Sequence, residues 1–482
     1  MHAAALLLTL SAGPYDVVCL VPEGDPYEAA ADALIERHEA RRLRATPGDL
    51  ASLLPAWRER PPENVAVVVR PEDLDVNLAA ELLAVSTRVD GDPFADFAWG
   101  VVTGRTAEAA VALVGASDPG RPRPEPAVRQ FGVGGDQLPR SMTQAGFLAA
   151  GRGVVPLMSY LSKGDSDEAS DRAFIKESLP ALNDAPILLL ASHGYPDGMV
   201  GGLKAADVAR LDLGGSVVLN IACYTAVTGR WFEDDWRAGA VAARTCDPAD
   251  SFALAVLDAA PAAYVAYAGP RPSGPALMAE AVRVAGSGRS MGELRREAAN
   301  AVVMAHLLAG GDGVAADPQR EGEQLDPART AGDVVARMAV GGVLFGDPAF
   351  VPFPENSALE AVRLTLTPRG EELRAEVALE TMMPHLFAGD ELTYWGGRGP
   401  AVKLEAAVPL DGRPVADVRL SRKPVEGSPH VLAAAVEEHG GRRLLRVKAV
   451  QPQPAGMTAG FAGEFVVTFG EGGPAVVRHK AE

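Results

Sequence analysis

Short apolar runs alternate with segments of helical periodicity over most of the chain before residue 355. The runs YDVVCLVP (15–22) and NVAVVV (64–69) are compact and rich in valine, which is typical of buried strands. Residues 25–41 and 106–117 repeat alanine and other apolar residues at the spacing of one helix face, and Thr106 stands where it would cap the second helix. Strands that alternate with helices predict a parallel sheet covered on both faces, and therefore an α/β fold.

The same alternation resumes after SDPGRPRPEP (117–126), a Pro- and Gly-rich segment that we interpret as a linker between two α/β halves. The second half closes with GGVLFGDPAFVPFP (341–354), read as a strand and a turn. Further strands are predicted at 96–105, 128–135, 154–161, 185–191, 216–222 and 262–269, and further helices at 141–151, 170–182, 250–259 and 276–286.

The pattern changes after Pro354 to short apolar runs separated by Gly, Pro and Asp turns, without helical periodicity. This spacing predicts an all-β sandwich. We therefore divide the chain into residues 1–13, a truncated signal or a first strand; 14–117, an N-terminal α/β subdomain; 118–356, a second α/β subdomain; and 357–482, a C-terminal β-sandwich.

Composition excludes some classes of partner. The 45 basic and 63 acidic residues give a formal net charge of -18, which opposes binding to nucleic acid or to an anionic membrane surface. No apolar run approaches the roughly 18 to 20 residues needed to cross a bilayer. The three cysteines, Cys19, Cys223 and Cys246, provide no disulfide framework. The localisation stays open, with export slightly favoured by the apolar start MHAAALLLTLSAG.

Two of the predicted buried strands end in side chains that can do chemistry. His193 follows the run at 185–191, and Cys223 follows the next run, 30 positions later (223 minus 193). Since residues after the carboxyl ends of parallel strands face a common crevice, we expect the two side chains to converge there. A thiolate is a good nucleophile, and an imidazole can supply the proton that a leaving amine needs. Gly194, with no Cβ, can present its backbone N–H to an oxyanion.

This arrangement resembles the clan CD cysteine peptidases, the group with the caspase fold. The resembling features are His-Gly after one strand and Ala-Cys after another. Closer similarity to the gingipain family lies in the pair Gly104-Arg105, in Gly346-Asp347-Pro348 at the end of an apolar strand, and in a β-rich segment after the predicted catalytic region. Glycine loops continue after His193 at Gly198, Gly201 and Gly202.

The resemblance implies a caspase/gingipain-like α/β fold of two parallel-sheet halves, followed by an immunoglobulin-like β-sandwich. It implies a cysteine endopeptidase with Cys223 as nucleophile, His193 as general acid/base, and the N–H groups of Gly194 and Cys223 as oxyanion donors. The substrate would be a protein or peptide. No cofactor would be required, although members of the family can bind structural calcium. The oligomeric state is left open.

Other candidate residues have simpler interpretations beside the functional ones. Glu233, Asp234 and Asp235 could form an acidic pocket for a basic substrate residue, or they could lie in a solvated loop, which we favour. Cys19 is expected in a buried strand, and Cys246 is a weaker candidate nucleophile. GDSDEASD (164–171) departs from a calcium loop and is read as a helix start. Asp347 is expected to fix a turn.

Two alternative functions stay open at this stage. The chain could be a catalytically inactive caspase-like scaffold that only binds partners. It could also bind carbohydrate or a surface through the C-terminal sandwich. The sequence contains no Walker loop, His-Glu-x-x-His helix or Cys-x-x-Cys pair, so these other chemistries receive no support.

Overall fold

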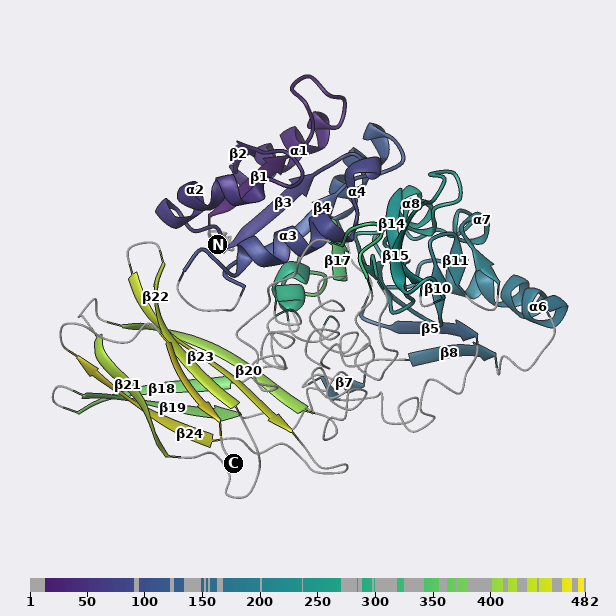
Figure 1. Cartoon of the computed structure of the whole chain (residues 1–482). Coiled ribbons are helices and arrows are strands. Elements are labelled where there is room, and N and C mark those ends of the chain that lie inside the picture. The colour runs from purple at the N-terminus through teal and green to yellow at the C-terminus, as the bar shows by residue number, and fades with distance from the viewer. Residues whose placement is uncertain are drawn as a thin grey trace, which may run out of the picture.

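Figure 1 shows the fold of the 482-residue chain in a computed structural model. The structure describes residues 14–90, 95–121, 125–133, 149–150, 153–154, 157–162, 168–199, 202–235, 237–269, 284, 288–296, 299, 319–324, 342–354, 362–369, 372–379, 401–410, 415–422, 431–439, 442–452, 462–469 and 476–480. Within the part of the chain so described, no helix combines the length and the apolar character that crossing a membrane requires.

A ten-stranded sheet forms the centre of the fold, in the order β2-β1-β3-β4-β17-β16-β13-β9-β5-β8. All neighbouring strands pair in parallel except β16 and β17, which are antiparallel. The strands are β1 (Tyr15–Cys19), β2 (Arg41–Arg44), β3 (Asn64–Val68), β4 (Ala98–Val102), β5 (Val128–Val133), β8 (Leu157–Ser162), β9 (Ile187–Ala191), β13 (Val217–Asn220), β16 (Ala263–Tyr267) and β17 (Gly342–Phe345).

Helices connect and cover these strands, as the alternating pattern predicts. They are α1 (Glu28–His38), α2 (Leu54–Glu59), α3 (Val76–Ser86), α4 (Ala107–Ala116), α6 (Glu168–Ser178), α7 (Ala205–Val208) and α8 (Phe252–Asp258), with the 3-10 turns η1 (Leu50–Leu53), η2 (Pro71–Asp73) and η4 (Leu179–Leu182). Thr106 caps α4 as predicted, because its side chain accepts a hydrogen bond from the Ala109 N–H. The mixed α/β class with a large, mostly parallel sheet is therefore confirmed.

Several sequence predictions change in detail. Residues 149–150 of the predicted helix 141–151 form β6 (Ala149–Ala150), paired with β7 (Gly153–Val154), and the rest of that segment lies outside the described residues. Most of the predicted helix 276–286 also lies outside them. Residues 233–235, read as a solvated acidic loop, belong to an antiparallel hairpin of β14 (Arg230–Asp235) and β15 (Ala240–Thr245). Three short strands follow His193: β10 (Gly194–Tyr195), β11 (Gly198–Met199) and β12 (Leu203–Lys204).

The two predicted α/β halves contribute strands to one continuous sheet. Strand β17, from the end of the second half, pairs with β4 of the first half at Phe345 and Val101. Arg105 of the first half adds a contact by donating to Asp258 at the end of α8, at 2.7 Å. Its neighbour Gly104 packs so closely on α4 that a Cβ would lie 2.7 Å from the Ala110 nitrogen. The Gly-Arg pair noted in the sequence thus supports packing between elements.

The described residues of the C-terminal segment form two four-stranded antiparallel sheets, drawn in green to yellow in Figure 1. Their orders are β18-β19-β24-β21 and β20-β23-β22-β25. The immunoglobulin-like type of this segment is not confirmed and stays a prediction. The strands are β18 (Val362–Arg369), β19 (Glu372–Leu379), β20 (Ala401–Leu410), β21 (Val415–Arg422), β22 (Val431–His439), β23 (Arg442–Pro452), β24 (Ala462–Phe469) and β25 (Val476–Lys480).

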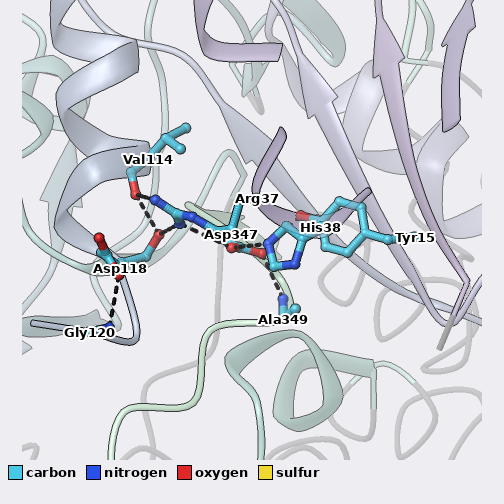
Figure 2. A network of polar contacts seen from close by, with 9 residues as sticks. Tyr15, Arg37, His38, Val114, Asp118, Gly120, Asp347 and Ala349 are labelled. Atoms are coloured by element: carbon cyan, nitrogen blue, oxygen red, sulfur yellow. Dashed lines mark hydrogen bonds and ion pairs between the residues drawn. The ribbon is translucent and has the colours of Figure 1, made fainter. Parts of the chain in front are cut away.

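Asp347, two residues beyond the end of β17, joins the end of the second half to the first half (Figure 2). Its carboxylate accepts a hydrogen bond from the Tyr15 hydroxyl at 2.8 Å and lies 2.7 Å from His38 Nε2 and 3.4 Å from Arg37. The Tyr15 and His38 rings stack with their centroids 4.2 Å apart. Asp347 also accepts from the Ala349 N–H at 2.9 Å, so the predicted turn-fixing role is confirmed.

The electrostatics of this cluster favour a charged Asp347. Burial alone would raise the pKa of the carboxyl, which is 1% exposed, but the hydrogen bonds and charge around it, led by His38, outweigh burial and lower the pKa. Burial and the adjacent carboxylate together raise the pKa of Tyr15 well above its ordinary value, so that the hydroxyl stays a donor. The cluster is therefore a buried ionic connection between the start of the first half and the end of the second.

We predict that Asp347→Asn lowers the free energy of unfolding by about 3 kcal/mol at pH 7, because one partner of a buried ionic group is removed. The folded-state pKa of Asp347 is lowered, so its stabilising contribution is present above the unfolded-state pKa of about 4 and is lost as the pH falls through the lower folded-state value. Urea unfolding at pH 7 and pH 3 measures this. The difference in unfolding free energy between the wild type and Asp347→Asn should be smaller at pH 3 than at pH 7. An equal difference at both pH values would contradict the prediction.

Candidate active site

The register of β9 and β13 places the two predicted catalytic residues just beyond the ends of neighbouring strands. The strands are parallel neighbours in which Val217 lies opposite Ile187 and Asn220 lies opposite Leu190. Residues that face each other across this pair are 30 positions apart in the sequence (217 minus 187). His193 and Cys223 are also 30 positions apart. The Ile221 N–H still donates to the Leu190 carbonyl at 3.0 Å beyond the last strand pair. Both residues therefore leave the sheet at its carboxyl edge on adjacent strands, as expected from the sequence.

Gly194 lies directly against the turn that carries Cys223. A Cβ added to this glycine would come within 2.6 Å of both the Ala222 Cβ and the Cys223 carbonyl oxygen, and within 3.0 Å of Thr225 Cγ2. Contacts this short leave no room for a side chain, so the backbone after His193 packs on the backbone of the cysteine turn. Gly194 also pairs with Met199 across β10 and β11. The oxyanion role of the Gly194 and Cys223 N–H groups stays a prediction.

Accessibility separates Cys223 from the other two thiols. None of the three cysteines forms a disulfide; Cys19 and Cys246 are buried, whereas Cys223 is partly exposed and His193 is exposed. Burial raises the pKa of Cys19. Burial, with the charges of Asp197 and two further aspartates, raises the pKa of Cys246 to about 11. Both buried thiols stay protonated at neutral pH, so Cys223 is the better candidate nucleophile.

A buried polar network holds the strand end and the turn on both sides of Cys223. The Asn220 side chain accepts from the Ala222 N–H at 2.9 Å and donates to the Tyr264 hydroxyl at 3.3 Å. The Tyr264 hydroxyl donates to the Thr225 carbonyl at 2.8 Å, and Thr225 Oγ1 donates to the Ala222 carbonyl at 2.8 Å. Because Asn220, Tyr264 and Thr225 are all buried, these bonds are shielded from competing water.

The backbone of the turn is also tied to the neighbouring strand β16. The Tyr224 N–H donates to the Gly269 carbonyl at 3.2 Å, and the Ala226 N–H donates to the Tyr267 carbonyl at 2.9 Å. Further along, Thr228 Oγ1 donates to the Pro71 carbonyl of the first half at 2.6 Å. The segment after the candidate nucleophile is therefore anchored to both halves of the sheet. Sequence reasoning did not identify Asn220 or Tyr264, since their contacts depend on which strands are neighbours.

The acidic candidates lie on the β14–β15 hairpin, where two of them already have partners. Glu233 forms an ion pair with Arg244 on the opposite strand. Asp235 accepts hydrogen bonds from the Ala238 and Arg237 N–H groups at the hairpin turn, the first of which contributes most to lowering the pKa of its carboxyl. Asp234 pairs with Val241 through the ladder. The carboxylates of Glu233 and Asp235 thus stabilise the hairpin itself.

A metal centre is the remaining feature that the resemblance raises. Among the residues that the structure describes, no group of three or more His, Cys, Asp or Glu side chains could hold a metal ion. Residues 164–167 lie outside the described residues, and residues 168–171 form the start of α6, in agreement with the reading of this segment as a helix start. Structural calcium stays a prediction from the resemblance.

We predict that Gly194→Ala slows the alkylation of Cys223 and lowers the melting temperature, because the new methyl group must displace the cysteine turn. Iodoacetamide labelling followed by peptide mass spectrometry, with thermal unfolding in parallel, measures both effects. The matched control is Gly115→Ala in α4, where nothing lies within 4 Å of the added Cβ. Alanine there should raise the free energy of unfolding by up to about 1 kcal/mol. Equal behaviour of the two variants would contradict the prediction.

We predict that Tyr264→Phe lowers the free energy of unfolding by about 1–3 kcal/mol, because it removes a hydrogen bond to the buried Thr225 carbonyl and another from Asn220. Urea unfolding provides the measurement. Tyr195→Phe is the control, since Tyr195 is 53% exposed and its change should stay within about 0.5 kcal/mol. A Tyr264→Phe variant as stable as this control would show that the network does not stabilise the turn.

Comparisons with known proteins show structural similarity without sequence similarity. No protein-family model and no curated protein matches the chain. The Arg-specific cysteine proteinase gingipain R (RGPB) is similar, with a TM-score of 0.45 and 11% identity over 91% of this chain and 92% of that one. The complex of Porphyromonas gingivalis RgpB pro- and mature domains is similar with a TM-score of 0.44 and 11% identity, over 95% of this chain and 93% of that one.

A third structure, described only as a protease, gives a TM-score of 0.43 and 10% identity over 97% of both chains. Each of the three similarities extends over more than nine tenths of this chain, at a TM-score below 0.5. Identities of 10–11% are too low to transfer an activity, so the chemistry must be argued from the residues around Cys223.

Proposed function

We propose that the chain is a cysteine peptidase in which Cys223 is the nucleophile and His193 is the general acid/base. The observation that carries the proposal is the shared sequence offset, which aligns the ends of two adjacent parallel strands, with Gly194 packed on the Cys223 carbonyl. Fold similarity alone would not suffice, because one fold supports many functions. The accessible thiol and the exposed imidazole supply the two groups that the chemistry needs.

The proposed reaction has two stages. His193 takes the thiol proton as the Cys223 sulfur attacks the scissile carbonyl carbon, and the resulting oxyanion accepts hydrogen bonds from the Gly194 and Cys223 N–H groups. The carbon–nitrogen bond then breaks, His193 transfers a proton to the departing amine, and a thioester remains on Cys223. In the second stage His193 removes a proton from water, the hydroxide oxygen attacks the thioester, and the carboxylic acid and thiol are released. These steps use only a peptide and water.

The finer parts of the proposal concern selectivity and ions. Cleavage after a basic residue would require acidic groups that face the substrate, and two of the candidates, Glu233 and Asp235, are engaged within the hairpin. We therefore do not assign these carboxylates to a pocket for a basic substrate residue. Structural calcium would stabilise the protein without entering the reaction, and unfolding with and without EDTA tests for it.

We predict that Cys223→Ala abolishes peptide cleavage and that His193→Ala reduces kcat by at least about 100-fold, the usual contribution of a general acid/base. A peptide-library digest read by mass spectrometry measures activity and reports the residue before the cleaved bond. Cys19→Ala is the control, because this thiol is buried in the first half and its removal should leave cleavage intact at a temperature where the variant is folded.

Cleavage by the Cys223→Ala variant at the wild-type rate would exclude this mechanism. If the wild-type protein cleaves no member of the library, and Cys223 is alkylated no faster than Cys19 and Cys246, the inactive scaffold becomes the better description. A surplus of Lys or Arg before the cleaved bond would support selectivity for basic residues, and an even distribution would exclude it.

A further inference from the structure

The residue after the candidate nucleophile has an unusual backbone conformation. Tyr224 has φ of 59°, in the left-handed region, and is one of four non-glycine residues with positive φ among those that the structure describes. This conformation costs a residue with a Cβ roughly 1–2 kcal/mol, so the surrounding contacts must hold Tyr224 in place. The position matters because the torsion angles of Tyr224 set the direction of the chain next to the Cys223 thiol.

The side chain of Tyr224 has a specific partner on the hairpin. Its ring meets Trp231 of β14 edge to face, with centroids 4.7 Å apart and planes at 63°. Trp231 lies in a buried cluster with Val227 and Cys246, and Tyr224 packs against that cluster. Edge-to-face aromatic pairs of this kind stabilise beyond their buried area. The hairpin therefore supplies one side of an aromatic contact whose other side adjoins the candidate nucleophile.

The backbone of Tyr224 is held at both of its polar groups. Its N–H donates to the Gly269 carbonyl at 3.2 Å, and its carbonyl accepts from the Val227 N–H at 3.1 Å. On the other side of Cys223, Ala222 is fixed by Asn220 and Thr225. Cys223 thus lies between two anchored residues, one held by a polar network and the other by an aromatic ring.

We propose that Tyr224 and Trp231 form a positioning device for the Cys223 thiol. The ring contact stabilises the left-handed turn, and the left-handed turn directs the thiol toward the carboxyl edge of the sheet where His193 lies. Tyr224 and Trp231 are positioning residues, and the β14–β15 hairpin supports the nucleophile through Trp231. The cleavage part of this inference rests on the proposed function, whereas the effect on thiol reactivity does not.

The test compares substitutions that separate the ring from the backbone conformation. Tyr224→Phe keeps the ring and should react like the wild type. Tyr224→Ala removes the ring and keeps the penalty for a left-handed backbone, so iodoacetamide alkylation of Cys223 should slow by about five- to thirtyfold, the range to which that penalty corresponds. Tyr224→Gly removes the ring and the penalty together, and should recover most of the lost rate.

The second partner gives an independent variant. Trp231→Ala should slow alkylation of Cys223 as Tyr224→Ala does, and combining Trp231→Ala with Tyr224→Gly should restore the rate, because glycine no longer needs the ring contact. Alkylation is followed by peptide mass spectrometry over a pH series, at a temperature where circular dichroism shows each variant folded. Cys19 and Cys246 serve as buried internal references in the same digests.

The matched control is Glu39, another non-glycine residue with a left-handed backbone, at φ of 51° after α1. Glu39→Ala and Glu39→Gly should change stability without changing the alkylation of Cys223. The proposal is overturned if Tyr224→Ala and Tyr224→Gly react equally fast, or if the Glu39 variants alter Cys223 as much as the Tyr224 variants do.

The outcomes distinguish this proposal from the peptidase proposal. If the wild type cleaves no peptide and glycine still rescues alkylation relative to alanine, the positioning device stands and the peptidase function is excluded. If the wild type cleaves peptides and all Tyr224 variants retain its kcat and KM, the peptidase stands and the device is excluded. If both proposals are correct, the kcat for peptide cleavage falls in Tyr224→Ala with little change in KM.

Discussion

The parallel pairing of β9 with β13 is the constraint on which the rest of the candidate site depends. A shift of the register by one residue would turn the side chains of one strand to the other face of the sheet and separate the strand ends. Every residue of both strands is buried, so the side chains on both faces are close-packed, and a slip would require this packing to be remade along the whole length. The placement of His193 and Cys223 beyond the ends of adjacent strands is thus a consequence of hydrophobic packing earlier in the two strands.

Packing alone does not orient the end of a strand, and here polar contacts take over. After Asn220 the chain leaves the sheet, and its backbone groups must find partners that the ladder no longer provides. Asn220, Thr225 and Tyr264 supply them, in a setting where an unsatisfied group would be costly. The turn carrying Cys223 is consequently specified by three buried side chains and the adjoining backbone of β16. This division explains how a partly exposed residue can lie on a turn that buried contacts hold.

The sequence was sufficient where local pattern decides structure. The buried runs that became β9 and β13, the cap at Thr106 and the turn at Asp347 were all predicted, because each depends on neighbours in the chain. Strand β2, with the sequence RRLR, was missed because charge hides its strand character until Asp16 is seen to pair with Arg41. The hairpin after Cys223 was read as a loop for the same reason. The Asn220–Tyr264 contact joins residues 44 positions apart and required knowledge of the strand order.

The contacts between the two halves show that the first half belongs to the framework of the site. Arg105 reaches Asp258, Asp347 reaches His38 and Tyr15, and Thr228 reaches Pro71, so the halves are connected through ionic and neutral hydrogen bonds. The last of these contacts lies shortly after Cys223 in the chain. A movement of the first half would therefore pull on the turn through a short, largely buried segment. Because packed interfaces shift between discrete arrangements and resist gradual deformation, the halves and the turn should hold or move together.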